Sequence, residues 1–235
     1  MRYAIYYTPL RDDPLMAAGS TWLGRDAFTG ERTHAPTGGS MTCEEISRVT
    51  AAPRRYGFHA TLKAPFALAP DQDEPELLRS LMHFGGSIEP VVIPRLTIAS
   101  LGPFFALVPA AENAALHQLA NDVVVAFERF RAPLCEREIA RRNPGSLTVS
   151  QLNNLQRWGY PYVFDDFRFH MTLTGPVEAH DRARLRRTLE AFFAPVLEEP
   201  VTIANLALFV EPEANAPFQV HSLHPLAVTR RRRSA

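Results

Sequence analysis

The sequence predicts an α+β fold made of two similar halves, with two antiparallel or mixed sheets lining a central cleft and helices outside. Three observations predict it: a ten-residue motif occurs twice, similar elements follow each copy, and the links between elements are short. The copies, Tyr56 to Pro65 and Phe167 to Pro176, share the pattern aromatic-x-Phe-His-x-Thr-Leu-x-x-Pro. We therefore expect one bilobal domain over residues 1–235.

The first half-repeat is expected at 1–103, on hydrophobic periodicity and on the Gly85-Gly86 pair, which can end a helix. The second is expected at 104–229, with a helix that places Leu116, Leu119 and Val123 at helical spacing. A disordered basic tail is expected at 230–235. The expected strands outside the motifs are 2–7, 91–98, 104–108, 201–209 and 218–223, and the expected helices are 43–49, 75–84, 114–130 and 181–193.

Two segments, 12–40 and 133–166, do not follow the repeat. Both are irregular, except for a short helix expected near 148–158. Long irregular segments in compact proteins are often lids or binding loops, but a segment that merely covers an edge strand explains them equally well.

Composition narrows the classes of partner. Lysine plus arginine number 25 and aspartate plus glutamate number 25, so no net charge attracts nucleic acid or a membrane surface. The two cysteines, Cys43 and Cys135, are too few for a disulfide framework or a structural zinc site. Since no apolar run approaches the length of a membrane span and no signal peptide is recognisable, we expect a cytoplasmic protein. Nothing in the sequence indicates the oligomeric state.

The motif places chemistry on one face of a strand. Alternate side chains of a strand share a face, so His59 lies with Thr61, and His170 with Thr172. The intervening residues are apolar and are expected to be buried, which fixes the register. The same alternation adds four candidate substrate-binding residues on the polar faces: Lys63, Arg168, Thr174 and Arg55.

Two histidines on either side of a phosphorus atom can divide the work of proton transfer. A neutral imidazole can act as general base and an imidazolium as general acid, each contributing about 10²- to 10⁴-fold. Hydroxyls and cations nearby would bind the non-bridging oxygens. No metal or cofactor is required, and the sequence does not say which histidine is the acid.

A lone His-x-Thr on a strand is unspecific, and a single histidine is more often structural than catalytic. Two copies, each within the same ten-residue pattern, favour a functional role for the histidines. His34, His83, His117 and His180 have no such frame. His221 and His224 are three residues apart and fall on opposite faces of a strand, which argues against a metal site.

The paired Phe-His-x-Thr-Leu motifs resemble the two-histidine (2H) phosphoesterase superfamily. The stretches 2–6, 22–26, 54–63 and 157–163 look like an uncharacterised family encoded in bacterial phosphonate-utilisation operons. The resemblance implies a duplicated bilobal fold, motifs on central strands beside a cleft, and catalytic roles for His59, Thr61, His170 and Thr172. Trp22 and Trp158 lie outside the superfamily pattern and either shape a pocket or pack the insertions.

The sequence and this resemblance together predict a metal-independent phosphoesterase that hydrolyses a small cyclic phosphodiester, a sugar or nucleotide cyclic phosphate, with an implied role in phosphonate metabolism. RNA end-processing is one alternative, which the neutral charge does not favour. A catalytically idle nucleotide-binding or regulatory module is the other. Intact histidines and threonines in both copies argue against that module.

Overall fold

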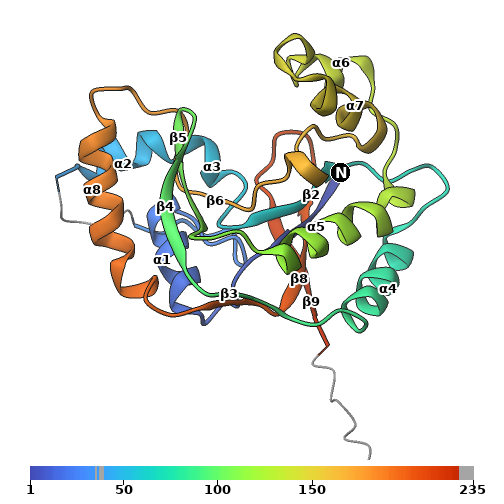
Figure 1. Cartoon of the computed structure of the whole chain (residues 1–235), viewed down its shortest axis with the longest axis horizontal. Coiled ribbons are helices and arrows are strands. Elements are labelled where there is room, and N and C mark those ends of the chain that lie inside the picture. Colours follow the sequence, from blue (N-terminus) through green and yellow to red (C-terminus); the bar gives the residue numbers. More distant parts are fainter. Residues whose placement is uncertain (35, 37–39, 228–235) are drawn as a thin grey trace, which may run out of the picture.

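The computed structural model describes residues 1–34, 36 and 40–227, and it confirms the α+β class (Figure 1). Seven strands form one sheet in the order β4-β5-β6-β2-β1-β8-β9, and β3 and β7 form a separate two-stranded sheet; every pairing is antiparallel. The strands are β1 (Arg2–Tyr7), β2 (Ala60–Phe66), β3 (Val91–Ile93), β4 (Leu96–Leu101), β5 (Phe104–Pro109), β6 (Met171–Thr172), β7 (Val201–Ile203), β8 (Asn205–Glu211) and β9 (Gln219–Pro225).

This sheet arrangement corrects the expectation of two sheets lining a central cleft. Strands from both predicted halves join in one continuous sheet, because β6 pairs with β5 on one side and with β2 on the other. The predicted boundary between 103 and 104 falls in the β4–β5 hairpin, where Leu101 pairs with Phe104. The half-repeat limits stay a prediction, and the predicted tail at 230–235 lies outside the described residues.

The helices flank the sheet, and no helix in the described ranges combines the length and apolar character that crossing a bilayer requires. The α-helices are α1 (Pro14–Leu23), α2 (Cys43–Val49), α3 (Ala51–Arg54), α4 (Glu74–Gly85), α5 (Ala114–Ala126), α6 (Glu136–Ala140), α7 (Val149–Trp158) and α8 (Arg182–Phe193). Short 3-10 turns lie at Glu128–Phe130, Pro144–Ser146, Phe164–Asp166 and Ala194–Val196.

Helix α1 lies inside a segment that the sequence predicts to be irregular, although it has the usual signals at both ends. The Asp13 carboxylate accepts a hydrogen bond from the backbone N–H of Leu15 at 2.8 Å, and Pro14 opens the first turn. Gly24 ends the helix in the left-handed conformation, with a φ of 77°. The Gly, Ser and Thr residues within the helix obscure this pattern.

The first insertion packs against both motifs. Gly19 of α1 lies so close to Phe58 that a Cβ atom there would come within 2.2 Å of the phenyl ring. The indole N–H of Trp22, a fully buried residue, donates to the carbonyl of Leu173 at 2.9 Å. Trp22 therefore packs the insertion onto the second motif.

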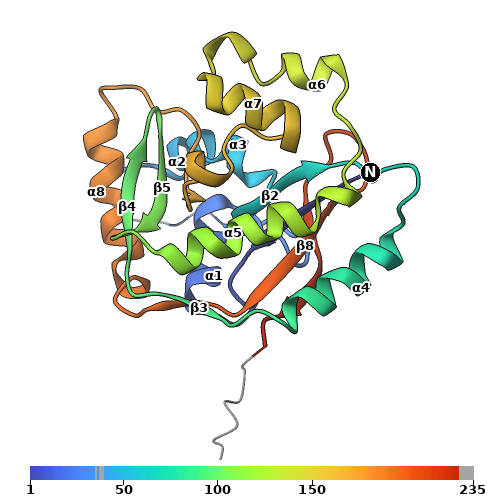
Figure 2. The same ribbon diagram turned by 45° about the vertical axis from the view of Figure 1, so that its right-hand side comes forward.

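The two faces of β1 have different neighbours, which separates the core from the site. Tyr3, Ile5 and Tyr7 point into the main apolar core. Ala4 and Tyr6 point to the opposite face, into a smaller cluster with Phe209 and Phe218. Helix α5 packs on β2, and α4 packs on β8 and β9. Figure 2 shows α5 beside β2 and α4 beside β8.

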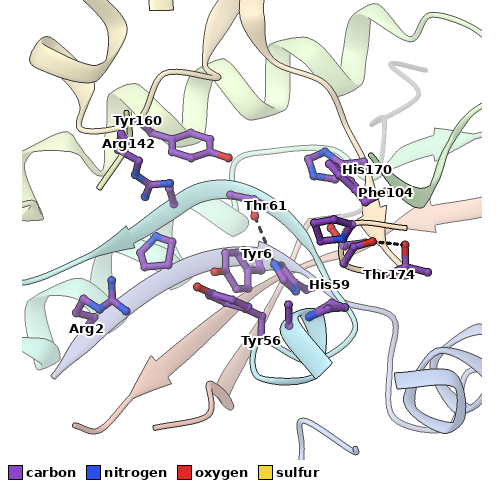
Figure 3. Close-up of a pocket in the computed structure, with 17 residues that line it drawn as sticks. Arg2, Tyr6, Tyr56, His59, Thr61, Phe104, Arg142, Tyr160, His170 and Thr174 are labelled. Carbon is purple, nitrogen blue, oxygen red and sulfur yellow. Dashed lines mark hydrogen bonds between the residues drawn. The ribbon is translucent and has the colours of Figure 1, made fainter. Parts of the chain in front are cut away.

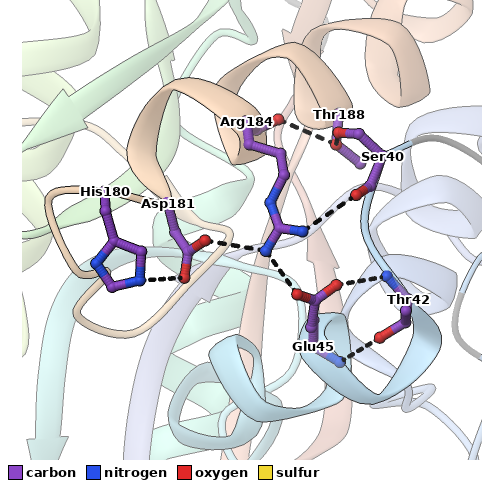
Figure 4. A network of polar contacts seen from close by, with 7 residues as sticks. All are labelled: Ser40, Thr42, Glu45, His180, Asp181, Arg184 and Thr188. Carbon is purple, nitrogen blue, oxygen red and sulfur yellow. Dashed lines mark hydrogen bonds and ion pairs between the residues drawn. The ribbon is translucent and has the colours of Figure 1, made fainter.

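Helices α2 and α8 are joined by a polar network (Figure 4). The guanidinium of Arg184 in α8 bonds the Glu45 carboxylate of α2 at 2.5 Å and the Asp181 carboxylate at 2.9 Å. Glu45 also accepts the backbone N–H of Thr42 at 2.7 Å, which completes the capping box of α2. One arginine thus ties the start of α2 to α8.

Helices α6 and α7, both from the second insertion, lie together above β2 in Figures 1 and 2. Three side chains join α7 to the chain just before the second motif. Ser150, Gln151 and Asn154 of α7 all donate to the Asp166 carboxylate, at 2.7, 3.1 and 3.1 Å. The insertion is thereby fixed beside His170.

Candidate functional site

A pocket of about 340 Å³ lies on the sheet face that Tyr6 and Thr61 share (Figure 3). Its volume falls within the range of small-molecule sites. The four residues proposed as catalytic from the sequence, His59, Thr61, His170 and Thr172, all line it. The other lining residues are Arg2, Tyr6, Ala52, Pro53, Tyr56, Ala64, Pro65, Phe104, Arg142, Tyr160, Thr174, Gly175 and Pro176.

The pocket forms where the two motif strands meet. Strand β6 pairs with β2 through Ala60 and Met171, each of which directly follows its histidine. Both of these residues are fully buried, so each strand is held with its apolar side in the core. This pairing brings His59 and His170 into one cavity, although 110 residues separate them in the sequence.

The two imidazoles are oriented by the same backbone contact. Nδ1 of His59 lies 3.0 Å from the carbonyl oxygen of Gly57, and Nδ1 of His170 lies 2.8 Å from that of Arg168. A carbonyl oxygen can only accept, so Nδ1 carries the proton in each ring. In the neutral tautomer Nε2 therefore has a free lone pair, and for His59 this atom lies 3.4 Å from the Thr61 hydroxyl.

Burial disfavours the protonated, cationic form of both imidazoles. It lowers the pKa of His59 to about 4, and the proximity of His170 acts in the same direction. Burial also lowers the pKa of His170. Without a ligand both imidazoles are thus neutral at neutral pH and can accept a proton at Nε2.

Aromatic rings form the floor of the pocket. The His59 ring stacks on Tyr6, and the Tyr56 ring stacks on Phe218 with centroids 5.3 Å apart. The chain reaches His59 through Gly57, which has a φ of 77°. A Cβ at Gly57 would come within 2.5 Å of the Ala27 Cβ, so this position requires glycine for both conformation and space.

The predicted placement of Lys63 beside Thr61 is corrected. On β1, Tyr6 pairs with Thr61 but Ile5 pairs with Lys63, so β2 has one extra residue and a bulge at Leu62. The bulge turns Lys63 to the face covered by α5. There its ammonium bonds the Glu128 carboxylate at 2.8 Å and the Val124 carbonyl at 3.2 Å, away from the pocket.

The other three predicted substrate-binding residues lie at different places. Arg55 is not in the pocket lining, and its guanidinium pairs with the buried Glu211. Thr174 lines the pocket, but its hydroxyl accepts the backbone N–H of Phe105 at 3.0 Å and donates to the Gly175 carbonyl at 2.8 Å. Arg168 is exposed and lines a neighbouring hollow that shares His170 with the main pocket.

Two arginines that the sequence did not single out line the pocket instead. Arg2 shares a face of β1 with Ala4 and Tyr6, so alternation along β1 could have found it. Arg142 lies in the second insertion, where no periodicity indicates its direction. Trp158 does not line the pocket; its ring packs edge-on against Phe164.

The charged side chains that line the pocket are positive. Arg2 and Arg142 line the pocket, and no aspartate or glutamate of the described chain does. Among those same residues no group of three or more histidines, cysteines or carboxylates is placed to hold a metal ion. The arrangement suits an anion that can exchange protons with two imidazoles.

Comparison with known proteins gives the family and two named relatives. Residues 61–219 match the model of a family described as "Protein of unknown function (DUF1045)"; the match contains His170 and Thr172 and begins just after His59. A protein of Janthinobacterium sp. (strain Marseille) is 38% identical over 221 residues, which cover 92% of this chain and 49% of that protein. One of Laribacter hongkongensis (strain HLHK9) is 37% identical over 227 residues, 94% of this chain and 50% of that protein.

Both relatives are named ribose 1,5-bisphosphate phosphokinase PhnN, and this chain spans about half their length. A phosphokinase transfers a phosphoryl group. The prediction of a phosphoric diester hydrolase acting on a cyclic phosphodiester is therefore wrong. The two alternatives, RNA end-processing and an idle nucleotide-binding or regulatory module, gain no support from that name.

The family match covers more than half of the chain and confirms the expected likeness to an uncharacterised family. The chain belongs to the family described as a protein of unknown function, DUF1045.

Proposed function

We propose that this chain binds a phosphorylated ribose in the pocket, with a phosphate held between His59 and His170, and that the two imidazoles exchange protons with the ligand. The observation that carries the proposal is the shared geometry of the two rings. Each ring donates a hydrogen bond from Nδ1 to the carbonyl two residues earlier. Both rings line one cavity, and no carboxylate of the described residues lines it. The names of the relatives support ribose phosphates as the class of ligand.

In this proposal His59, Thr61, His170 and Thr172 form the acid–base site. A phosphate dianion favours the imidazolium form of a nearby histidine, so one ring would take up a proton on binding and donate it from Nε2 to a phosphate oxygen. The other ring would stay neutral and accept a hydrogen bond at Nε2 from a hydroxyl group of the ribose. The Thr61 and Thr172 hydroxyls would donate to the remaining phosphate oxygens.

A P-loop for a nucleotide donor is not part of the proposal. Such a loop has the pattern G-x-x-x-x-G-K-[ST], in which the lysine contacts the phosphates. The only lysine of the sequence is Lys63, which follows Leu62 instead of a glycine. The proposed ligand of the pocket is therefore the ribose phosphate alone.

We also propose that the scaffold is a duplicated, bilobal one of the two-histidine type, with half-repeats at 1–103 and 104–229, and that the protein acts in phosphonate metabolism. The gapless alignment of the two motifs and the matching contacts of their histidines support the duplication. The resemblance to a family of phosphonate-utilisation operons supports the metabolic role.

Calorimetry and phosphorus NMR test the proposal. Ribose 5-phosphate should bind, with a heat that depends on the ionisation enthalpy of the buffer because a proton is taken up. His59→Ala and His170→Ala should each weaken binding by about tenfold or more. His83→Ala is the matched control, because His83 is exposed on α4 and does not line the pocket. Equal affinity of the wild type and both pocket variants, with folding checked by circular dichroism, would refute the proposal.

A further inference from the structure

We infer that the pocket contains a second anion-binding position, formed by Arg142 with Arg2, so that it selects a sugar carrying two phosphate groups over one carrying a single phosphate. The inference rests on the proposed function for the first phosphate position, between the histidines. The second position depends on different residues and on a different end of the cavity (Figure 3).

Arg142 is a positive charge without a carboxylate partner in the described part of the chain. Two other arginines, by contrast, have carboxylate partners: Arg55 pairs with Glu211, and Arg131 bonds Glu128 at 2.6 Å. The guanidinium of Arg142 instead lies over the ring of Tyr160, 5.0 Å from its centroid. Stacking on an aromatic face holds the guanidinium plane while leaving its N–H donors for a ligand.

The support beneath Arg142 is itself fixed. Tyr160 follows Gly159, which ends α7 with a φ of 73°, and its ring packs edge-on against Tyr162 with centroids 5.5 Å apart. Burial raises the pKa of Tyr160, so its phenol stays protonated and can donate a hydrogen bond. The second insertion therefore presents one cation and one neutral donor to the same end of the pocket.

Arg2 adds to the charge at this end. It bonds the Glu211 carboxylate at 2.5 Å, and Arg55 pairs with the same carboxylate. Two guanidiniums and one carboxylate leave an excess of one positive charge. The hydrogen bond from the Cys135 backbone N–H is the main cause of the lowered pKa of Glu138, and the nearby charge of Arg2 lowers that pKa further. Glu138 does not line the pocket.

Figure 3 shows how the two positions are arranged. Arg2, Arg142 and Tyr160 lie toward one end of the pocket, and His170 with Phe104 lies toward the other. The rings of Tyr6 and Tyr56 lie between them. An aromatic floor with an anion-binding group at each end fits a sugar ring with a phosphate at each end.

Arg142→Gln tests the inference by calorimetry with three ligands: inorganic phosphate, ribose 5-phosphate and ribose 1,5-bisphosphate. The wild type should bind the bisphosphate at least about tenfold more tightly than the monophosphate, as one charge-assisted contact provides. Arg142→Gln should remove that preference, because it should weaken binding of the bisphosphate more than binding of the monophosphate. Arg142→Lys, which keeps the charge but not the planar fork, should retain part of the preference.

Arg157→Gln is the matched control, because Arg157 stacks on Trp158 at the same 5.0 Å in the same insertion but does not line the pocket. It should leave the preference unchanged. A wild type that binds both ribose phosphates equally, or an Arg142→Gln variant that keeps the preference, overturns the inference and leaves the proposed function standing. A wild type that binds neither overturns both.

Discussion

The imidazole of His59 stacks on the ring of Tyr6, with centroids 3.9 Å apart and an interplanar angle of 23°. Tyr6 is 1% exposed and comes from β1, whereas His59 directly precedes β2. The neighbouring strand thus supplies the surface that shields the first histidine from water. This contact is part of the burial that lowers the pKa of His59 to about 4.

Replacing Tyr6 by leucine should raise the pKa of His59 toward the ordinary value of 6.5, because a smaller side chain admits water to one face of the ring. Titration of histidine resonances by NMR measures this shift. Tyr162→Leu is a suitable control, since Tyr162 is 45% exposed. An unchanged His59 pKa in Tyr6→Leu would show that other neighbours determine its burial.

Acid should destabilise the protein over a defined pH range. The pKa of His59 is lowered in the folded state, so the unfolded chain binds more protons between pH 6.5 and about 4. The free energy of unfolding should fall by at most about 3 kcal/mol as the pH decreases through this range. Below the range, His59 should cause no further change in this free energy. Urea denaturation at several pH values measures the slope.

His59→Gln provides the control for that slope, because glutamine does not titrate. The variant should show a shallower decrease over the same range. If its slope equals that of the wild type, other groups, such as His170 and His224, whose pKa values are also lowered by burial, account for the acid sensitivity.

Lys63 should matter for stability and not for ligand binding. Its ammonium is buried against Glu128, so Glu128→Gln leaves a buried charge without its carboxylate and should cost roughly 3 kcal/mol. Lys63→Met replaces the cation by an apolar chain of similar length and should cost less, about 1 kcal/mol. Thermal denaturation compares the two variants. Loss of phosphate affinity in a folded Lys63→Met variant would contradict the assignment.

Gly57→Ala should damage both the fold and the site. The left-handed backbone and the contact with Ala27 should together lower the free energy of unfolding by about 2 kcal/mol. The Gly57 carbonyl also orients His59, so phosphate affinity should fall in the folded variant. Gly145→Ala is the control, since a Cβ there meets nothing within 4 Å. Equal stability of the two variants would contradict the argument.

Alternation along a strand predicted the site as far as the strand is regular. It placed His59 with Thr61 correctly, and it failed at Lys63 because one extra residue at Leu62 reverses the faces. A bulge depends on how β1 pairs with β2, which the local sequence of β2 does not reveal. In the short strand β6 the alternation also holds, with Met171 buried and Thr172 less so. The reason is the same as in β2 before its bulge, because apolar residues flank each histidine.

Contacts between residues far apart in the sequence determine which other side chains line the pocket. Arg142 and Tyr160 belong to a segment without periodicity, in which a network around Asp166 holds α7 against the chain that leads into the second motif. Arg55 seemed a phosphate ligand by alternation, but the buried Glu211, distant in the sequence, binds it instead. The sequence shows neither partnership, because each joins residues whose proximity exists only in the folded chain.

The two-residue strand β6 has a consequence for the order of folding. It is an interior strand of the seven-stranded sheet, between β5 and β2, yet it comes from residues 171–172 of 235. Strand β2 therefore lacks one of its two neighbours until this distant segment pairs with it, and pairing over such sequence distances is slow. Recovery of ligand binding should coincide with the slowest refolding phase, which makes the pocket a reporter of completed assembly.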